Sequence, residues 1–139
     1  MHNGQRISLV IPCYNEEKGL AEMLQKKPAV IDEVIVIDNL STDRTAEVAR
    51  QYGAIVVPET IQGYGIAYQA GLPKATGDIV VMMDGDDTYP LLQVEEMLTY
   101  MQEKSYDFLT GCRFPLACKD AMPGYKQISN HTISWMIRR

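Results

Sequence analysis

Short runs of branched apolar residues alternate along this chain with longer amphipathic stretches, and this alternation constrains the fold more than any other feature. Nearly continuous apolar runs are typical of strands buried on both faces of a parallel sheet, and the intervals between them are long enough for helical crossovers. The sequence therefore predicts an α/β fold, a Rossmann-like, doubly wound and mostly parallel sheet with helices on both faces. The predicted strands occupy residues 7–11, 34–37, 54–57, 78–83 and 108–110.

The intervening segments have the periodicity and the terminal residues of helices. Leu20 and Leu24 recur at the spacing of one helix face. Ser41 is expected to cap the second helix and Gly53 to end it, and Pro12 is expected to end the first strand. The predicted helices occupy residues 16–27, 41–52, 66–75 and 91–104.

Composition excludes several classes of protein. With 139 residues, 46% of them hydrophobic, the chain is long enough for one domain with a buried core. The net charge of −5 and the absence of Lys/Arg clusters argue against nucleic-acid binding. The polar first residues do not resemble a signal peptide, and no apolar run approaches the roughly 18–20 residues of a membrane span. The cysteines are too scattered for a disulfide framework or a zinc site, which favours the cytoplasm: Cys13, Cys112 and Cys118.

Acidic and polar residues follow three of the predicted strands, at residues 12–17, 38–39 and 84–87. If these strands are parallel, the three clusters meet at one rim of the sheet, where α/β proteins bind ligands. Carboxylates about 4 Å apart repel by roughly 1–4 kcal/mol in water or near a surface. A bound cation or buried hydrogen-bond donors would relieve that repulsion.

Asp84 and Asp86 flank Gly85 directly after the fourth predicted strand. Two carboxylates in such a turn can face one hard divalent cation, and Mg²⁺ prefers one or two carboxylates together with phosphate oxygens and water. The alternative is a turn whose acidic side chains are only solvated. The two further acidic clusters expected at the same rim favour the metal site.

Three other rim residues have a functional and a structural interpretation. Asp38 can accept hydrogen bonds from a ribose hydroxyl or a base, or it can help to cap the next helix. Tyr14 can stack on a nucleobase or cover the edge of the core. Glu16 can hold a ribose hydroxyl or interact with the positive end of its own helix.

Two further features bear on phosphate binding. Gly63 and Gly65 do not form a dinucleotide fingerprint, because Tyr68 stands where the third glycine is required. Arg113 follows the fifth predicted strand, and its guanidinium is suited to a diphosphate. A surface arginine is the alternative.

In order and together, these motifs resemble glycosyltransferase family 2, which has the GT-A fold. The resemblance is carried by residues 10–17, 33–43 and 77–86 and covers about residues 6–113. Residues 84–90 and 111–113 are similar to the polyprenyl-phosphate branch, which includes dolichol-phosphate mannose and glucose synthases.

The resemblance implies transfer of a hexose, with inversion, from a nucleotide-diphosphate sugar of the UDP-glucose or GDP-mannose type. It implies that Asp84 and Asp86 hold Mg²⁺ or Mn²⁺ against the diphosphate, with Arg113 as the third catalytic residue. Thr88 stands where some members carry a glutamine that contacts the metal, and Asp87 is a candidate to compensate. The donor-binding residues implied by the resemblance are Pro12, Tyr14, Glu16, Asp38, Asp84 and Arg113.

The acceptor is expected to be a polyprenyl phosphate. A phosphate acceptor is already an anion and needs no strong general base, whereas a glycan hydroxyl does, and no clear base follows Arg113. Residues 1–139 are expected to be the N-terminal part of one GT-A catalytic domain, without its acceptor side. An apolar helix start around Trp135 suggests contact with a membrane surface. The whole protein is therefore expected at the cytoplasmic face of a membrane, and a homo-oligomer stays open.

Two alternatives differ in kind. The chain can be a nucleotide-sugar-binding module that is inactive by itself, which a turnover assay would distinguish from an enzyme. A receiver-type signalling domain is also a small α/β layer with clustered carboxylates, but it needs an aspartate at the end of its third strand. Here that strand ends at Val57 and Pro58.

Overall fold

The computed structural model of the chain describes residues 1–111, so the predictions for Arg113, for two of the cysteines and for the segment around Trp135 lie outside the described residues. The chain divides into two compact units, residues 1–107 and residues 108–139, and the first contains all the helices and strands described below. Between residues 1 and 111, no helix has the length and apolar character needed to cross a bilayer.

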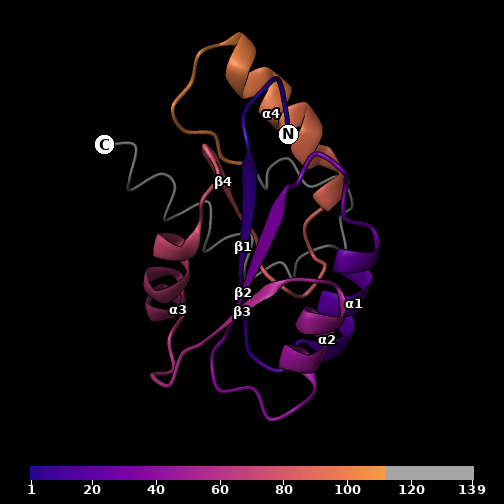
Figure 1. Cartoon of the computed structure of the whole chain (residues 1–139), viewed down its shortest axis with the longest axis vertical. Helices are drawn as coiled ribbons and strands as arrows, with labels where there is room; N and C mark the ends of the chain where they lie inside the picture. Colours follow the sequence, from indigo (N-terminus) through magenta and orange to yellow (C-terminus); the bar gives the residue numbers. More distant parts are fainter. Residues whose placement is uncertain (112–139) are drawn as a thin grey trace, which may run out of the picture. The chain divides into compact units, whose positions relative to one another are not determined.

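The described sheet has four strands in the order β3-β2-β1-β4, and every neighbouring pair is parallel. The chain runs outward from β1 to β3 and then crosses to the other side of β1, so the strand order reverses between β1 and β4 (Figure 1). Ligands of open α/β sheets bind beyond the carboxyl ends of the strands at such a point. The strands are β1 (Ile7–Cys13), β2 (Glu33–Asp38), β3 (Ile55–Pro58) and β4 (Ile79–Met82).

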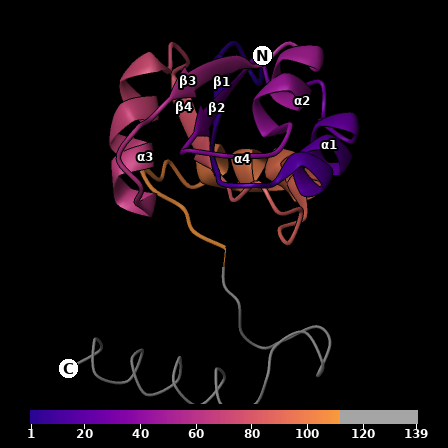
Figure 2. The ribbon, with the colours of Figure 1, turned by 90° about the horizontal axis from the view of Figure 1, so that it is seen from below.

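Helices cover both faces of this sheet, which confirms the doubly wound arrangement. Figures 1 and 2 show α3 on one side and α1 and α2 on the other. Alternate residues of β1 face the two layers: Leu9 packs with Leu20 of α1, whereas Val10 packs with Ala67 of α3. The helices are α1 (Glu17–Gln25), α2 (Thr45–Gln51), α3 (Tyr64–Gly71) and α4 (Val94–Glu103), with 3₁₀ turns at Leu72–Lys74 and Leu91–Gln93.

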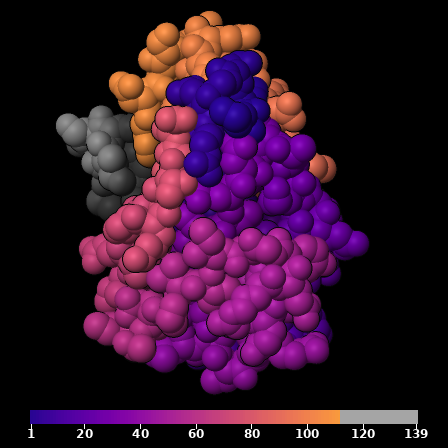
Figure 3. Space-filling view, viewed as in Figure 1, coloured from indigo at the N-terminus to yellow at the C-terminus, as the bar shows by residue number. Residues whose placement is uncertain are grey.

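Within residues 1–111, β4 forms one edge of the sheet. Val80 and Met82 point to the same face of β4 and are 40% and 50% exposed. The segment with the colour of β4 accordingly reaches the surface beside the N-terminal residues in Figure 3.

Three details of the sequence prediction are wrong. Pro12 does not end β1. The proline nitrogen has no hydrogen to donate, but β4 stops pairing with β1 at Val10, so no strand on that side requires a hydrogen bond from Pro12. Ser41 does not cap α2, which begins at Thr45. Residues 108–110 do not form a strand, and Phe108 is 81% exposed.

Candidate functional site at the carboxyl ends of the strands

The predicted acidic clusters converge at the end of β1. Cys13 is the register partner of Asp38 on β2, so the last residues of the two strands lie side by side. Gly85 packs over the same cysteine: a Cβ added to Gly85 would lie 2.6 Å from the Cys13 Sγ. The predicted convergence is therefore confirmed, although the roles of these residues stay predictions.

The Asp84–Asp86 turn fits closely between β1 and α1. A Cβ added to Gly19 of α1 would lie 2.9 Å from the Asp86 Cα and 2.9 Å from the Gly85 carbonyl oxygen. A side chain at Gly19 would collide with the turn, and one at Gly85 would collide with Cys13. The two glycines thus allow the acidic turn to approach the switch point of the sheet closely.

Both carboxylates of this turn are partly engaged by hydroxyl groups. Tyr64 at the start of α3 donates its hydroxyl to the Asp84 Oδ1 over 2.8 Å. Asp86, which is exposed, accepts hydrogen bonds at Oδ1 from the backbone N–H and the hydroxyl of Thr88, at 3.0 and 2.7 Å. The Thr88 hydroxyl, the weak metal contact suggested by the sequence, therefore orients Asp86 in this structure.

Negative charge accumulates around Glu16 and Cys13. Partial burial raises the pKa of Glu16, and repulsion from Asp86, Asp43 and Asp84 raises it further. Burial likewise raises the pKa of the Cys13 thiol, with additional contributions from carboxylates that include Glu16 and Asp38. The thiol is therefore protonated at neutral pH, and the surrounding field favours a bound cation.

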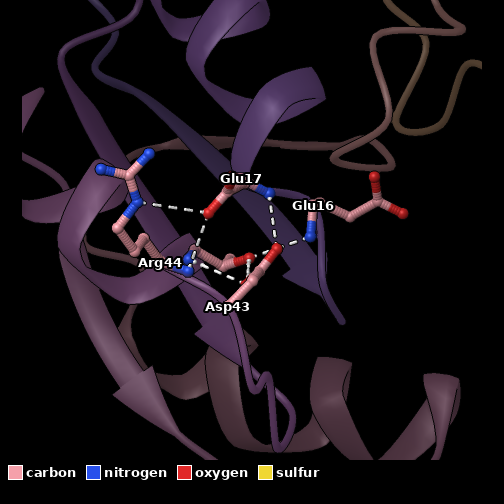
Figure 4. A network of polar contacts seen from close by, with 5 residues as sticks. Glu16, Glu17, Asp43 and Arg44 are labelled. Carbon is pink, nitrogen blue, oxygen red and sulfur yellow. Dashed lines mark hydrogen bonds and ion pairs between the residues drawn. The ribbon is translucent and has the colours of Figure 1, made fainter.

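The first turns of α1 and α2 cap each other (Figure 4). Asp43 accepts a hydrogen bond at Oδ2 from the backbone N–H of Glu17, and the Thr45 hydroxyl oxygen accepts one from the N–H of Glu16. In return, the Glu17 carboxylate accepts a hydrogen bond from the N–H of Arg44 over 3.0 Å. Side chains at the start of each helix thus accept hydrogen bonds from free N–H groups of the other helix, a role that local capping residues normally have.

The loops before these helices are joined in the same way. The Asn15 backbone N–H donates to the Ser41 Oγ over 3.0 Å, and the Asn15 Oδ1 accepts from the N–H of Thr42 over 2.7 Å. We call residues 15–17 and 41–45, with their mutual hydrogen bonds, the loop clasp. In Figure 4 the Glu16 carboxylate points away from the clasp. The clasp therefore fixes the backbone at the ends of β1 and β2 while leaving that carboxylate available.

Asp43 is expected to be the residue of the clasp that contributes most to stability. Burial alone would raise the pKa of Asp43, but hydrogen bonds from Thr45 and from the N–H of Glu17 lower it overall. Asp43→Ala should reduce the free energy of unfolding by about 2 kcal/mol at pH 7, because it removes an acceptor shared by two helix ends. Because the folded pKa is lowered, this contribution is complete above the unfolded pKa of about 3.9 and disappears as pH falls through the folded pKa.

Urea unfolding at pH 7 and at about pH 3 checks this expectation. Glu22→Ala, which removes an exposed carboxylate from the middle of α1, is the control and should change stability by less than about 0.5 kcal/mol. An equal effect of Asp43→Ala at both pH values would contradict the charged-acceptor explanation.

The remaining predicted donor-binding residues lie at the same rim. Tyr14 follows β1 and is 50% exposed, so its ring is available to a ligand. Asp38 is partly buried, and its Oδ1 accepts a hydrogen bond from the N–H of Ser41 over 3.1 Å. Pro12 is the penultimate residue of β1.

The donor set fits a metal ion that is shared with a substrate. Among the described residues, no group of three or more His, Cys, Asp or Glu side chains could enclose a metal ion. Two carboxylates on a tight turn, in a field that raises the pKa of Glu16, suit Mg²⁺ or Mn²⁺ that takes its other ligands from phosphate and water. Asp84 and Asp86 would hold such an ion.

A cavity of about 300 Å³ lies beyond the acidic turn, and neither Asp84 nor Asp86 lines it. An ion pair of 2.7 Å between Lys26 and Asp87 connects the end of α1 with this loop. Asp87, the suggested replacement ligand, thus already has a partner. The lining residues are Lys26, Asp87, Thr88, Tyr89, Pro90, Leu91 and Leu92.

Sequence reasoning missed Gly19, Tyr64 and the role of Asn39. A glycine inside a predicted helix is a signal for close packing, and Gly19 is such a residue. Tyr64 gave no signal, because its contact with Asp84 depends on how α3 lies on the sheet. Asn39 was predicted as one of the polar residues that follow the second strand, whereas its side chain binds the loop before α3.

Comparison with known proteins agrees with this architecture. Residues 8–132 match the family model for glycosyl transferase family 2. Protein RfbJ of Shigella flexneri is 36% identical over 115 residues, which span 81% of this chain and 89% of that protein. The dolichyl-phosphate hexose transferase of Haloferax volcanii is 33% identical over 127 residues, 89% of this chain and 54% of that protein.

A solved structure shares the fold. The crystal structure of glucosyl-3-phosphoglycerate synthase from Mycobacterium tuberculosis, in complex with Mn²⁺, UDP and glucosyl-3-phosphoglycerate, matches with a TM-score of 0.53 and 34% identity. The match covers 59% of this chain and 34% of that chain, so this chain spans about a third of the solved protein. The expected GT-A class of α/β fold is thereby confirmed. A receiver-type domain is excluded, because in that fold the third strand pairs with the first, whereas here β3 pairs with β2. With the family model matching nearly the whole length of the sequence, this chain belongs to glycosyltransferase family 2.

Proposed function

We propose that this chain binds a nucleotide-diphosphate sugar together with Mg²⁺ or Mn²⁺ at the carboxyl ends of β1, β2 and β4. The observation that carries the proposal is the packing of the Asp84–Asp86 turn against Cys13, whose register partner is Asp38. This arrangement sets two candidate metal ligands beside residues suited to a nucleoside. The Mn²⁺ and UDP bound in the similar solved structure support the same ligand class.

The nucleoside would bind over the ends of β1 and β2. Tyr14 offers an exposed ring on which a base can stack, and Asp38 offers carboxylate oxygens to a ribose hydroxyl or a base N–H. Glu16 and Pro12 complete this side of the site. The loop clasp supports these assignments because it fixes the backbone on both sides of the proposed nucleoside.

The diphosphate would lie over the Asp84–Asp86 turn. A divalent ion bound there supplies positive charge to the diphosphate that leaves when the sugar bond breaks. Asp84 and Asp86 would hold that ion, and Arg113 is proposed to contribute a second positive group. Negative charge develops on the diphosphate in the transition state, so the two positive groups would stabilise the transition state more than the ground state. The three residues are the proposed catalytic set.

We further propose that the whole protein transfers a hexose, with inversion, to a polyprenyl phosphate. The likeness to a dolichyl-phosphate hexose transferase supports this acceptor. A phosphate oxygen is already an anion, so the reaction needs no strong general base. Such an acceptor would locate the whole protein at the cytoplasmic face of a membrane.

Calorimetry of the full 139-residue chain with UDP and with GDP, in MnCl₂ or in EDTA, tests donor binding. The expected result is binding of one nucleotide that is at least about tenfold tighter with Mn²⁺, a difference of about 1.4 kcal/mol. Failure to bind either nucleotide, or equal binding in EDTA, would reject the proposal. Incubating the whole protein with the matching nucleotide sugar and either a polyprenyl phosphate or an oligosaccharide then distinguishes the two acceptor classes.

A further inference from the structure

Two tyrosines of α3 contact the two residues that directly follow β4. Tyr64 donates its hydroxyl to the Asp84 Oδ1 over 2.8 Å, and Tyr68 donates to the carbonyl oxygen of Met83 over 3.5 Å. The two rings meet edge to face, with centroids 5.1 Å apart. The first two turns of α3 therefore reach across the switch point of the sheet to the proposed metal site.

The position of Tyr64 is fixed by a buried amide at the end of β2. Asn39 is only 5% exposed. Its Nδ2 donates to the carbonyl oxygens of Glu59 and Ile61 over 3.2 and 2.8 Å, and its Oδ1 accepts from the N–H of Gly63 over 2.8 Å. All three bonds hold the loop that leads directly into α3. Asn39 thus sets where the helix starts, and with it where the Tyr64 hydroxyl lies.

We propose that Tyr64 is a positioning residue for Asp84, with Asn39 holding Tyr64 in place. This inference rests on the proposed function, because it requires that Asp84 take part in binding the metal and the diphosphate. The hydroxyl holds one carboxylate oxygen and so restricts rotation of the carboxylate. The second oxygen is then already oriented when the metal arrives with the donor.

The expected effect follows from what such partners do in metal sites. Removing a hydrogen-bond partner of a metal ligand typically weakens metal binding by about 10–100-fold. Tyr64 is 64% exposed, so water can replace part of its contribution and the lower end of this range applies. Tyr64→Phe removes the hydroxyl and keeps the ring that contacts Tyr68.

Calorimetry with UDP and GDP, each in MnCl₂ and in EDTA, compares wild type with Tyr64→Phe. The Mn²⁺-dependent affinity of the variant should fall by about tenfold, while its affinity in EDTA and its thermal unfolding temperature without ligand stay unchanged. Tyr100→Phe is the control, because Tyr100 is also partly exposed and in edge contact with another tyrosine, but on α4. It should bind as wild type does.

The outcomes separate the two proposals. If wild type binds a nucleotide only with Mn²⁺ and Tyr64→Phe binds as well or better, the positioning role is wrong and the proposed function stands. Equal losses in MnCl₂ and in EDTA would also overturn that role, since they would indicate a contact with the nucleotide rather than an effect through Asp84. If wild type binds no nucleotide with Mn²⁺, the proposed function fails and the inference fails with it.

Discussion

Asp86→Asn is expected to weaken Mn²⁺-dependent nucleotide binding by about a hundredfold. Losing a hydrogen-bond partner of a metal ligand weakens metal binding by about 10–100-fold, and losing the charge of a ligand itself should reach the upper end of that range. Asparagine isolates the charge, because its side-chain oxygen can still accept the two hydrogen bonds from Thr88 that hold the turn. The shape of the turn should therefore survive while a charged candidate ligand is lost. Calorimetry in MnCl₂ and in EDTA measures the loss.

Asp87→Asn is the matched control for this substitution. Asp87 is the next residue along the chain and carries the same charge, but its carboxylate is paired with Lys26 at the surface. Breaking an ion pair at the surface has little effect on stability and should leave nucleotide affinity unchanged. If Asp86→Asn and Asp87→Asn weaken binding equally, the effect is one of net charge and Asp86 is not a metal ligand.

Gly19→Ala is expected to damage the site although Gly19 lies on α1 and is assigned no contact with the donor. The new Cβ would lie 2.9 Å from backbone atoms of Gly85 and Asp86, so the turn must retreat by about 0.5 Å to reach an ordinary contact of 3.4 Å. Overpacking of this kind costs about 1–3 kcal/mol, against a gain of at most about 1 kcal/mol in helix propensity. We expect a net loss of about 1–2 kcal/mol in the free energy of unfolding. We also expect Mn²⁺-dependent binding to be about tenfold weaker, since small displacements of positioned groups have large effects.

Gly65→Ala provides the comparison within the same protein. Gly65 also lies inside a helix, but no atom lies within 4 Å of an added Cβ. The substitution should therefore stabilise the fold by about 0.5–1 kcal/mol. Urea unfolding of both variants gives the stability change, and calorimetry gives the binding change. If Gly19→Ala stabilises the chain as Gly65→Ala does, the close approach of the turn to α1 is wrong.

The sequence was sufficient to predict the layers of the fold. Apolar runs mark β1 to β4, and the parallel direction of these strands follows from the length of the crossovers between them. The end of β1 was harder to predict, because a proline ends a strand only where its nitrogen faces a paired neighbour. At Pro12 the neighbour β4 has already stopped, and that depends on the relative lengths of two strands far apart in the sequence.

The rim of the site was predicted in part for a similar reason. Asp38 is the last residue of β2, and Glu16 and Asp84 come shortly after β1 and β4, so the parallel sheet alone brings them together. Local patterns did not predict the mutual part of the capping, in which Asp43 and Glu17 cap each other's helices across 26 residues of chain. Tyr64 depends on a third element, the buried Asn39, and no spacing in the sequence encodes that contact.

The loop clasp has a consequence for grafting loops from other members of the family in order to alter the proposed donor site. Residues 15–17 and 41–45 supply each other's hydrogen-bond partners. A chimera that receives only one of the two segments would therefore lack the partners of its donors and acceptors. The two segments should therefore be replaced together, while the strands of the sheet are kept.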